Sequence, residues 1–153
     1  MFGIGKVTKI GFAGTQHGMT FRQYESFAKL MDILSCLATE YHHGDCKGSD
    51  DEFHHWVLLY DNRPNIKIVI HPPENSYKRA FCTFSGNLEV RPEKPYLERN
   101  HDIVDETDLM IATPREYAET IRSGTWATIR YCRKQKKTIY IIYPDGEIIK
   151  NEF

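Results

Sequence analysis

Short apolar runs alternate along this chain with segments whose apolar residues are spaced like the buried face of a helix. Runs such as IKIVI and TIYIIY are rich in β-branched residues and have the length of strands. Between such runs, Phe27, Leu30, Met31, Leu34 and Leu37 recur at helical spacing. This pattern predicts strands over 7–14, 40–44, 66–73, 108–114 and 137–146, the last with a terminal turn. It predicts helices over 50–62, 96–107 and 124–134, with a further helix that begins after Thr20 or Ser26.

Residues 74–95 lack a clear period. They include Asn75, Ser76, Gly86, Asn87 and Pro92, which are typical of turns. We interpret this segment as a long loop with a helical turn at 78–82, and long loops in compact domains are often functional lids.

Strands that alternate with helices predict an α/β, Rossmann-like, doubly wound fold. We expect a mainly parallel sheet of about five or more strands, with helices on both faces. The 153 residues fit one domain spanning 1–153. In such sheets ligands bind beyond the carboxyl ends of the strands, so the segments that follow each strand are the candidate site.

Composition narrows the class of partner. Hydrophobic residues make up 41% of the chain and charged residues 27%, and the formal net charge is −1. This balance disfavours broad binding to duplex nucleic acid, which requires a basic face. The sequence shows neither a signal peptide nor an apolar run long enough to cross a membrane, which predicts a cytoplasmic protein without a membrane partner. We therefore interpret Cys36, Cys46, Cys82 and Cys132 as free thiols.

The stretch GTQHGMT, which follows the first strand, has the composition of an anion-binding turn. Gly14 lets the backbone approach a ligand closely, and the helix that follows offers unpaired N–H groups to a phosphate. Thr15, Gln16, His17 and Thr20 add polar side chains. The alternative is an ordinary strand–helix turn with a threonine cap.

The stretch HGDCKGSD repeats this arrangement after the second strand. Gly44 and Gly48 flank Asp45, whose carboxylate could accept hydrogen bonds from a ribose or a base, or act as a general base. Asp50 is a helix cap in the simpler interpretation. His71 directly follows the third strand and is a further candidate for ligand contact.

Several histidines and a cysteine lie close together in the sequence, which raises the question of a metal. They are His42, His43, Cys46, His54 and His55. Neighbouring histidines point apart on a strand or a helix, and no HxxxH or CxxC pair presents two ligands on one face. We expect no metal ion and no cofactor.

Two further segments suit an anion. Arg99 and Asn100 belong to the helix before the fourth strand, and a guanidinium binds phosphate through two hydrogen bonds. Ser123, Gly124 and Thr125 form a small-residue turn at the start of the next helix, whereas Trp126 belongs to the core.

Four stretches of the chain occur in an order that resembles the sequence pattern of the SLOG superfamily. They are GFAGTQHGMT, ERNHDIV, DLMIATP and SGTWATIRYCRK. This group joins the DNA-processing protein A (Smf) domain with the "lonely guy" nucleotide phosphoribohydrolases. The resemblance covers nearly the whole chain and implies a Rossmann-like nucleotide-binding domain, for which self-association is common. In the phosphoribohydrolases an ER pair precedes a PGGxGTxxE turn. Glu98 and Arg99 match that pair, which implies catalytic or phosphate-binding duty for Arg99.

Two departures from the hydrolase pattern bear on activity. IRSG stands in place of the PGG, and the glutamate position falls at Thr128. Ser123, Gly124 and Thr125 match the DNA-processing branch, which binds single-stranded DNA.

Three functions remain open. The first is binding of a nucleotide or nucleotide-derived small molecule. The second is hydrolysis of an N-glycosidic bond, with Asp45 and Arg99 as catalytic residues. The third is an interaction module for nucleic acid or protein, a less favoured partner class that the basic residues Arg130, Arg133, Lys134, Lys136 and Lys137 suggest.

Overall fold

A computed structural model describes residues 9–153, in which seven strands form one sheet. The strand order is β4-β3-β2-β1-β5-β6-β7, and all neighbours are parallel except β6 and β7. The strands are β1 (Lys9–Gly14), β2 (Glu40–His43), β3 (Lys67–Ile70), β4 (Asn87–Val90), β5 (Leu109–Thr113), β6 (Ile139–Ile142) and β7 (Ile148–Asn151). Positions 7 and 8 of the first predicted strand lie outside the described residues.

Within residues 9–153, four α-helices connect strands of the sheet: α1 (Phe21–Leu34), α2 (Ser49–Tyr60), α3 (Tyr96–Asp105) and α4 (Gly124–Lys134). Thr20 caps α1, because its hydroxyl accepts the N–H of Gln23 while the Gln23 side chain accepts the N–H of Thr20. The helix ends before Leu37, so the prediction of Leu37 on its buried face was wrong, and that side chain is 50% exposed.

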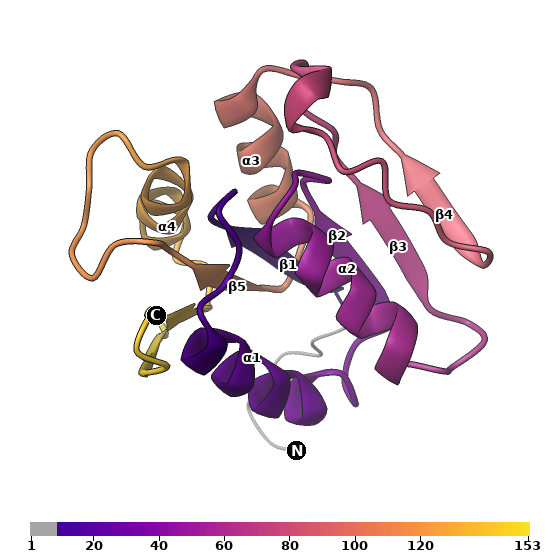
Figure 1. The fold of residues 1–153 in the computed structure, drawn as a ribbon, viewed down its shortest axis with the longest axis horizontal. Coiled ribbons are helices and arrows are strands. Elements are labelled where there is room, and N and C mark those ends of the chain that lie inside the picture. Colours follow the sequence, from indigo (N-terminus) through magenta and orange to yellow (C-terminus); the bar gives the residue numbers. More distant parts are fainter. Residues whose placement is uncertain (1–8) are drawn as a thin grey trace.

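Helices cover both faces of the sheet, as the alternating pattern predicted. Helices α1 and α2 lie on one face, while α3 and α4 lie on the other (Figure 1). The chain builds β2, β3 and β4 on one side of β1, then returns through α3 to place β5 on the other side. The fold is therefore doubly wound and mainly parallel, and this prediction is confirmed.

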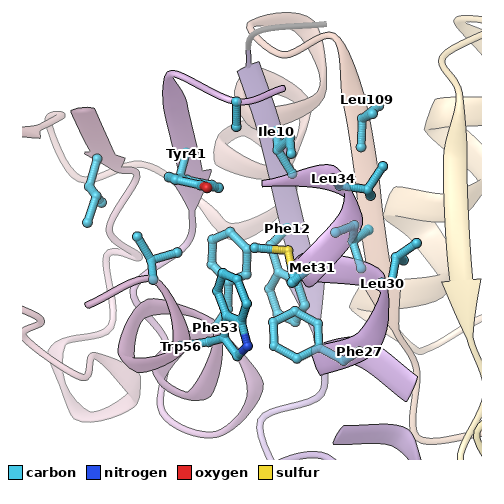
Figure 2. Packing of buried hydrophobic residues seen from close by; sticks show 14 of the residues in the cluster. Ile10, Phe12, Phe27, Leu30, Met31, Leu34, Tyr41, Phe53, Trp56 and Leu109 are labelled. Carbon is cyan, nitrogen blue, oxygen red and sulfur yellow. The ribbon is translucent and has the colours of Figure 1, made fainter. Parts of the chain in front are cut away.

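A core of aromatic side chains fills the face beneath α1 and α2. Phe12 of β1 stacks on Phe53 of α2 with ring centroids 4.7 Å apart, and Phe27 of α1 meets Phe12 edge to face (Figure 2). Such ring pairs add a favourable electrostatic contribution to the burial of apolar area. This packing fixes both helices on β1 and so fixes the loop that follows β1.

A second core lies beneath α3 and α4. It contains Ile103 and Val104 of α3, with Trp126 and Ile129 of α4. Trp126 is buried, as predicted. The two helices pack side by side across β1 and β5, which places the start of α4 at the carboxyl ends of these strands.

The strands β4 and β7 were not predicted from the sequence. The segment 74–95 contains a short 3-10 helix (Ser76–Lys78) and the edge strand β4, rather than only a loop with a turn at 78–82. Over 137–146 the predicted strand and terminal turn are present as β6 and a turn at 144–146, but the chain then returns as the antiparallel strand β7, which was not predicted. Both missed strands lie at sheet edges, where one exposed face weakens the apolar signal.

The four cysteines are free thiols, as predicted. Within residues 9–153, every helix is too short or too polar to span a lipid bilayer.

Candidate functional site

The carboxyl ends of β1 and β5 open onto a polar pocket of about 470 Å³. Gly14 and Thr113 end these two strands and are paired in register. The chain winds outward from β1 in opposite directions, so this is the point where doubly wound folds bind ligands. The pocket is lined by Gly14, Thr15, Gln16, His17, Lys78, Tyr96, Arg115, Glu116, Arg122, Ser123, Gly124 and Thr125.

Hydrogen bonds hold the turn after β1 in place. The Thr15 carbonyl accepts both the N–H and the hydroxyl of Ser49, at 3.0 and 2.8 Å, and the Thr15 N–H donates to the Thr113 carbonyl. The Thr15 hydroxyl accepts the N–H of His17. Gly18 has a φ of 85°, which favours glycine. The turn is therefore a rigid wall of the pocket.

The start of α4 forms the opposite wall. The Ser123 hydroxyl caps the helix by accepting the N–H of Trp126. The N–H groups of Gly124 and Thr125 belong to the first turn, where the helix supplies no acceptor. A Cβ on Gly124 would overlap the hydroxyl of Tyr96, so glycine is required where α4 approaches this ring. This wall presents amide hydrogens and the positive end of the helix dipole to a ligand.

Three cationic side chains that were not predicted from the sequence also line the pocket. They are Lys78, Arg115 and Arg122. Nη1 of Arg115 lies 2.8 Å from Nε2 of His17. Arg115 and Arg122 flank segments already selected after β5, so their position was a usable signal, whereas Lys78 arrives from a distant loop. The cations and the α4 amides together make the pocket attractive to anions.

Two more lining residues were also missed. Glu116 brings a carboxylate, of which Oε1 is buried without a hydrogen-bond partner among residues 9–153. Tyr96, at the start of α3, contributes an aromatic wall. Neither follows a motif that singles it out in the sequence.

Arg99 lies beneath the pocket, in a small adjoining cavity that shares Gly14, Gln16, Tyr96 and Thr125 with it. The guanidinium is buried. It donates to the carbonyls of Gly44 and His71, at 2.5 and 3.1 Å, and to the side chain of Asn100 at 2.7 Å. Its carbon lies 4.9 Å from the centroid of the Tyr96 ring. Arg99 therefore joins the ends of β2 and β3 to α3 and supports Tyr96, rather than lining the main pocket.

The structure does not bring Asp45 to the pocket. One carboxylate oxygen pairs with Nε of Arg79 at 2.7 Å, and the other accepts the N–H of Cys82 at 2.9 Å. The side chain is completely buried, and these two contacts hold the segment after the 3-10 helix against β2.

Other predicted residues also lie elsewhere. Gly44 and Asn100 line only the small cavity, whereas Thr20, Gly48 and His71 line neither space. A Cβ on Gly44 would overlap the Arg99 guanidinium, and one on Gly48 would overlap the Gln16 backbone. These glycines allow peptide segments to approach each other. The Thr20 hydroxyl donates to the Pro144 carbonyl.

Asp50 is another carboxyl near the pocket with an oxygen that is unsatisfied within residues 9–153. It lines the small cavity, and its Oδ2 accepts the N–H of Cys46, while Oδ1 has no partner among the described residues. Burial raises the pKa of this carboxyl to about 6. Perturbed carboxyls of this kind cluster at functional sites.

We expect Asp50→Asn to stabilise the fold at neutral pH. The folded-state pKa lies above the unfolded value, so the folded state prefers the protonated form, and ionisation at pH 7.5 costs about 2–3 kcal/mol. The gain in unfolding free energy should fall to about half near pH 5, because the two pKa values bracket that pH. Urea unfolding of the unmodified protein and of Asp50→Asn, at about pH 7.5 and about pH 5, measures this difference in unfolding free energy. Asp32→Asn, on the exposed side of α1, is the control, and an equal effect of both substitutions would contradict the prediction.

Some of the basic residues near the end of α4 have partners within the chain. Arg130 and Arg133 both pair with Glu119, at 3.2 and 3.4 Å, and Lys137 donates to the Thr107 carbonyl. This segment therefore offers a weaker positive surface than the sequence suggests.

The sheet order and the crossover at β1 define a Rossmann-like fold, and comparison with solved structures confirms a fold like that of DNA processing protein A. The chain is similar in structure to DNA processing protein A from Helicobacter pylori, with a TM-score of 0.62 and 16% sequence identity. The match covers 89% of this chain and 65% of that one, so the chain spans about two thirds of the length of its structural neighbour. That protein is described as binding single-stranded DNA in a unique mode. No protein-family model and no curated protein matches the sequence.

Proposed function

We propose that the pocket binds the phosphate and sugar of a nucleotide or nucleotide-derived small molecule. The observation that carries this proposal is the convergence of Lys78, Arg115 and Arg122 on the first turn of α4. Charged donors and backbone amides together suit a phosphate or diphosphate. The volume of about 470 Å³ lies within the range of small-molecule sites.

The remaining lining residues suit the rest of a nucleotide. Glu116 brings a carboxylate to this cationic pocket, and its Oε1 has no hydrogen-bond partner among residues 9–153; such a group accepts hydrogen bonds from ribose hydroxyls. Tyr96 supplies a ring beside the phosphate-binding wall. Phosphate would thus lie on α4, with the sugar toward Glu116.

Titration calorimetry tests the proposal with AMP, ADP, ADP-ribose, a cyclic nucleotide and inorganic phosphate. We expect a nucleotide to bind more tightly than phosphate. Arg122→Gln should weaken that binding about 10- to 100-fold, because a charge-assisted hydrogen bond contributes about 1.5–3 kcal/mol. Lys29→Gln removes the same charge from the exposed side of α1 and should leave affinity unchanged. The proposal fails if none of the compounds binds, or if both variants weaken binding equally.

Single-stranded DNA is the second candidate ligand, and the structural likeness to DNA processing protein A favours it. The same pocket would then hold one nucleotide of the strand. An oligodeoxythymidylate titrated at several salt concentrations separates the two candidates, since each phosphate contacted adds to a steep loss of affinity with salt. Tight, salt-sensitive binding of the oligonucleotide with weak binding of mononucleotides would select DNA.

A further inference from the structure

Four histidines are buried in two hydrogen-bonded pairs on opposite faces of the sheet. His42 and His71 lie on the face covered by α3, with Nδ1 of His42 2.8 Å from Nε2 of His71. His43 and His54 lie on the face covered by α2, with Nε2 of His43 2.9 Å from Nδ1 of His54. None of these residues lines the pocket. The groups that hydrogen-bond to the other ring nitrogens of each pair determine which nitrogen carries the proton. The two pairs differ in this respect.

The His43–His54 pair is closed to metal ions. The N–H of Asp45 donates to Nδ1 of His43, and Nε2 of His54 lies 2.7 Å from the Thr83 carbonyl, which only accepts. Hence Nε2 of His43 carries the proton and donates it to His54. A metal on that nitrogen would require the proton to move to Nδ1, where it would face the N–H of Asp45. Cys82 lies close enough to be a third ligand, but the hydrogen bonds already fix this pair as structural.

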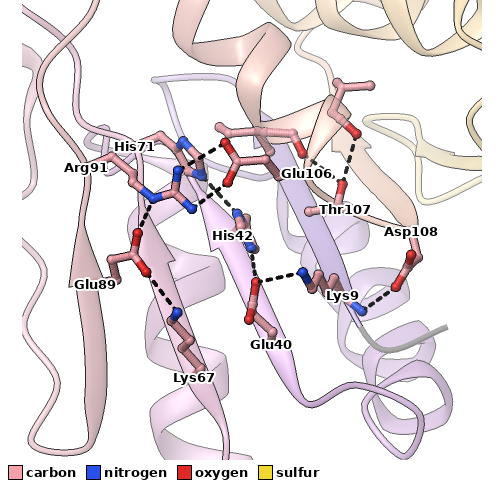
Figure 3. Close-up of polar contacts among 12 residues, drawn as sticks. Lys9, Glu40, His42, Lys67, His71, Glu89, Arg91, Glu106, Thr107 and Asp108 are labelled. Atoms are coloured by element: carbon pink, nitrogen blue, oxygen red, sulfur yellow. Dashed lines mark hydrogen bonds and ion pairs between the residues drawn. The ribbon is translucent and has the colours of Figure 1, made fainter.

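The His42–His71 pair has the opposite arrangement. Nε2 of His42 lies 2.5 Å from the carboxylate of Glu40, so the proton resides there and the Nδ1 lone pair points toward His71 (Figure 3). Metal-binding histidines commonly donate their second N–H to a carboxylate in this way, which fixes the tautomer and increases the basicity of the ligating nitrogen.

A carboxylate completes a set of three ligands. The candidate ligand atoms of His42, His71 and Glu106 all lie within 4.8 Å of one another. Glu106 caps the carboxyl end of α3, where the partial negative charge of the helix favours a cation. Its side chain is 30% exposed, which gives an ion access from solvent.

We propose that His42, His71 and Glu106 form a site for a divalent transition metal such as Zn²⁺, at the junction of β2, β3 and α3. Nδ1 of His42, Nε2 of His71 and a carboxylate oxygen of Glu106 are the ligands, and Glu40 orients His42. Two histidines and a glutamate are a known set for Zn²⁺, with the fourth position open to water. On binding, His71 moves its proton from Nε2 to Nδ1, so no net proton need be released.

Arg91 competes with the metal for Glu106. Its guanidinium contacts both Glu106 oxygens, at 2.6 and 3.2 Å, and also pairs with Glu89 (Figure 3). A metal must displace this cation from Glu106, while Arg91 can keep its contact with Glu89. Substitution of Arg91 should therefore increase the affinity of the site for a metal ion, which provides a direct test of the proposal.

The test uses the full chain freed of metal with a chelator and titrated with Zn²⁺ by calorimetry. We expect one Zn²⁺ per chain, with affinity at least tenfold weaker in Glu106→Gln and severalfold tighter in Arg91→Gln. Glu98→Gln changes an exposed carboxylate on the same helix and should bind like the unmodified chain. Both informative variants change partly exposed side chains, so loss of folding does not obscure the result.

Substitution by Co²⁺ provides an independent readout, since its visible spectrum reports nitrogen and oxygen ligands in a low-coordinate site. We expect His42→Gln to abolish that spectrum and His54→Gln to preserve it. Absence of micromolar binding would overturn the proposal. So would binding that Glu106→Gln and Arg91→Gln leave unchanged.

Discussion

The free energy of unfolding of this protein should fall by several kcal/mol as the pH falls from about 6.5 to about 5. His42, His43, His54 and His71 are all buried in the folded state, and burial lowers the pKa of each, to about 3 for His71. In the unfolded chain the same side chains titrate near pH 6.5. Below that pH the unfolded state binds more protons than the folded state, so the free energy of unfolding decreases.

The expected loss is large relative to total stability. Each histidine that stays neutral in the folded state lowers the free energy of unfolding by up to about 1.4 kcal/mol for each unit by which the pH falls below the pKa of the unfolded chain. His43 and His71, whose pKa values burial lowers furthest, together approach about 3 kcal/mol per pH unit, and His42 and His54 add to this, against a typical total stability of about 5–15 kcal/mol. Asp50 acts in the opposite direction, because its raised pKa favours the folded state at low pH, and offsets about one histidine.

Urea unfolding of the metal-free protein between about pH 8 and pH 5 measures this loss. Trp56 and Trp126 are buried in the two separate cores and report by fluorescence whether both unfold together. His71→Gln should reduce the pH dependence by one proton, whereas His55→Gln, which changes an exposed histidine, should leave it unchanged. A free energy of unfolding that is constant across this range would show that the buried pairs accept protons without opening.

Arg99→Gln should destabilise the protein severely, by about 3–5 kcal/mol. The substitution leaves the carbonyls of Gly44 and His71 without their donor, and it removes the cation nearest to the buried Asp50 carboxyl. For a domain of this size that corresponds to a fall of roughly 10–15 °C in the melting temperature. Arg99→Lys should do nearly the same, since an ammonium cannot reach all of these acceptors at once.

Thermal unfolding followed by circular dichroism measures the effect, with Arg122→Gln as the matched control. Arg122 is exposed at the pocket and should affect ligand affinity without affecting the melting temperature. This pair of variants separates support of the fold from contact with the ligand. If Arg99→Gln melts like the unmodified protein but no longer binds nucleotide, Arg99 contacts the ligand directly, as its resemblance to the hydrolase ER pair implies.

Much of the pocket was predictable because parallel strands bring their carboxyl ends to one edge. The turn at Gly14–His17 and the turn at Ser123–Thr125 were both selected on that ground, and they form opposite walls. The rule failed for His71, because its side chain points to the α3 face and is engaged by His42. Residues of one edge can thus face either layer, and strand position alone does not reveal which.

The chemistry of Asp45 and Arg99 was harder to predict. A carboxylate between glycines and an arginine on a helix both suit a ligand, but each finds its partners within the protein. Asp45 is engaged by Arg79 and Cys82, which approach from a loop that showed no periodicity. The same loop brings Lys78 to the pocket. Contacts between residues so far apart in sequence depend on how the loop folds back over β2.

The sequence by itself determined the doubly wound fold, since the alternation of strand-length apolar runs with amphipathic helices permits few other arrangements. It also determined the two turns that become pocket walls, because their glycines and hydroxyls directly follow strands or begin helices. Only the tertiary structure decided which charged groups face the pocket and which neutralise each other inside the protein. It also assigned the protons of the two histidine pairs, because a histidine tautomer depends on partners that packing supplies and local sequence does not.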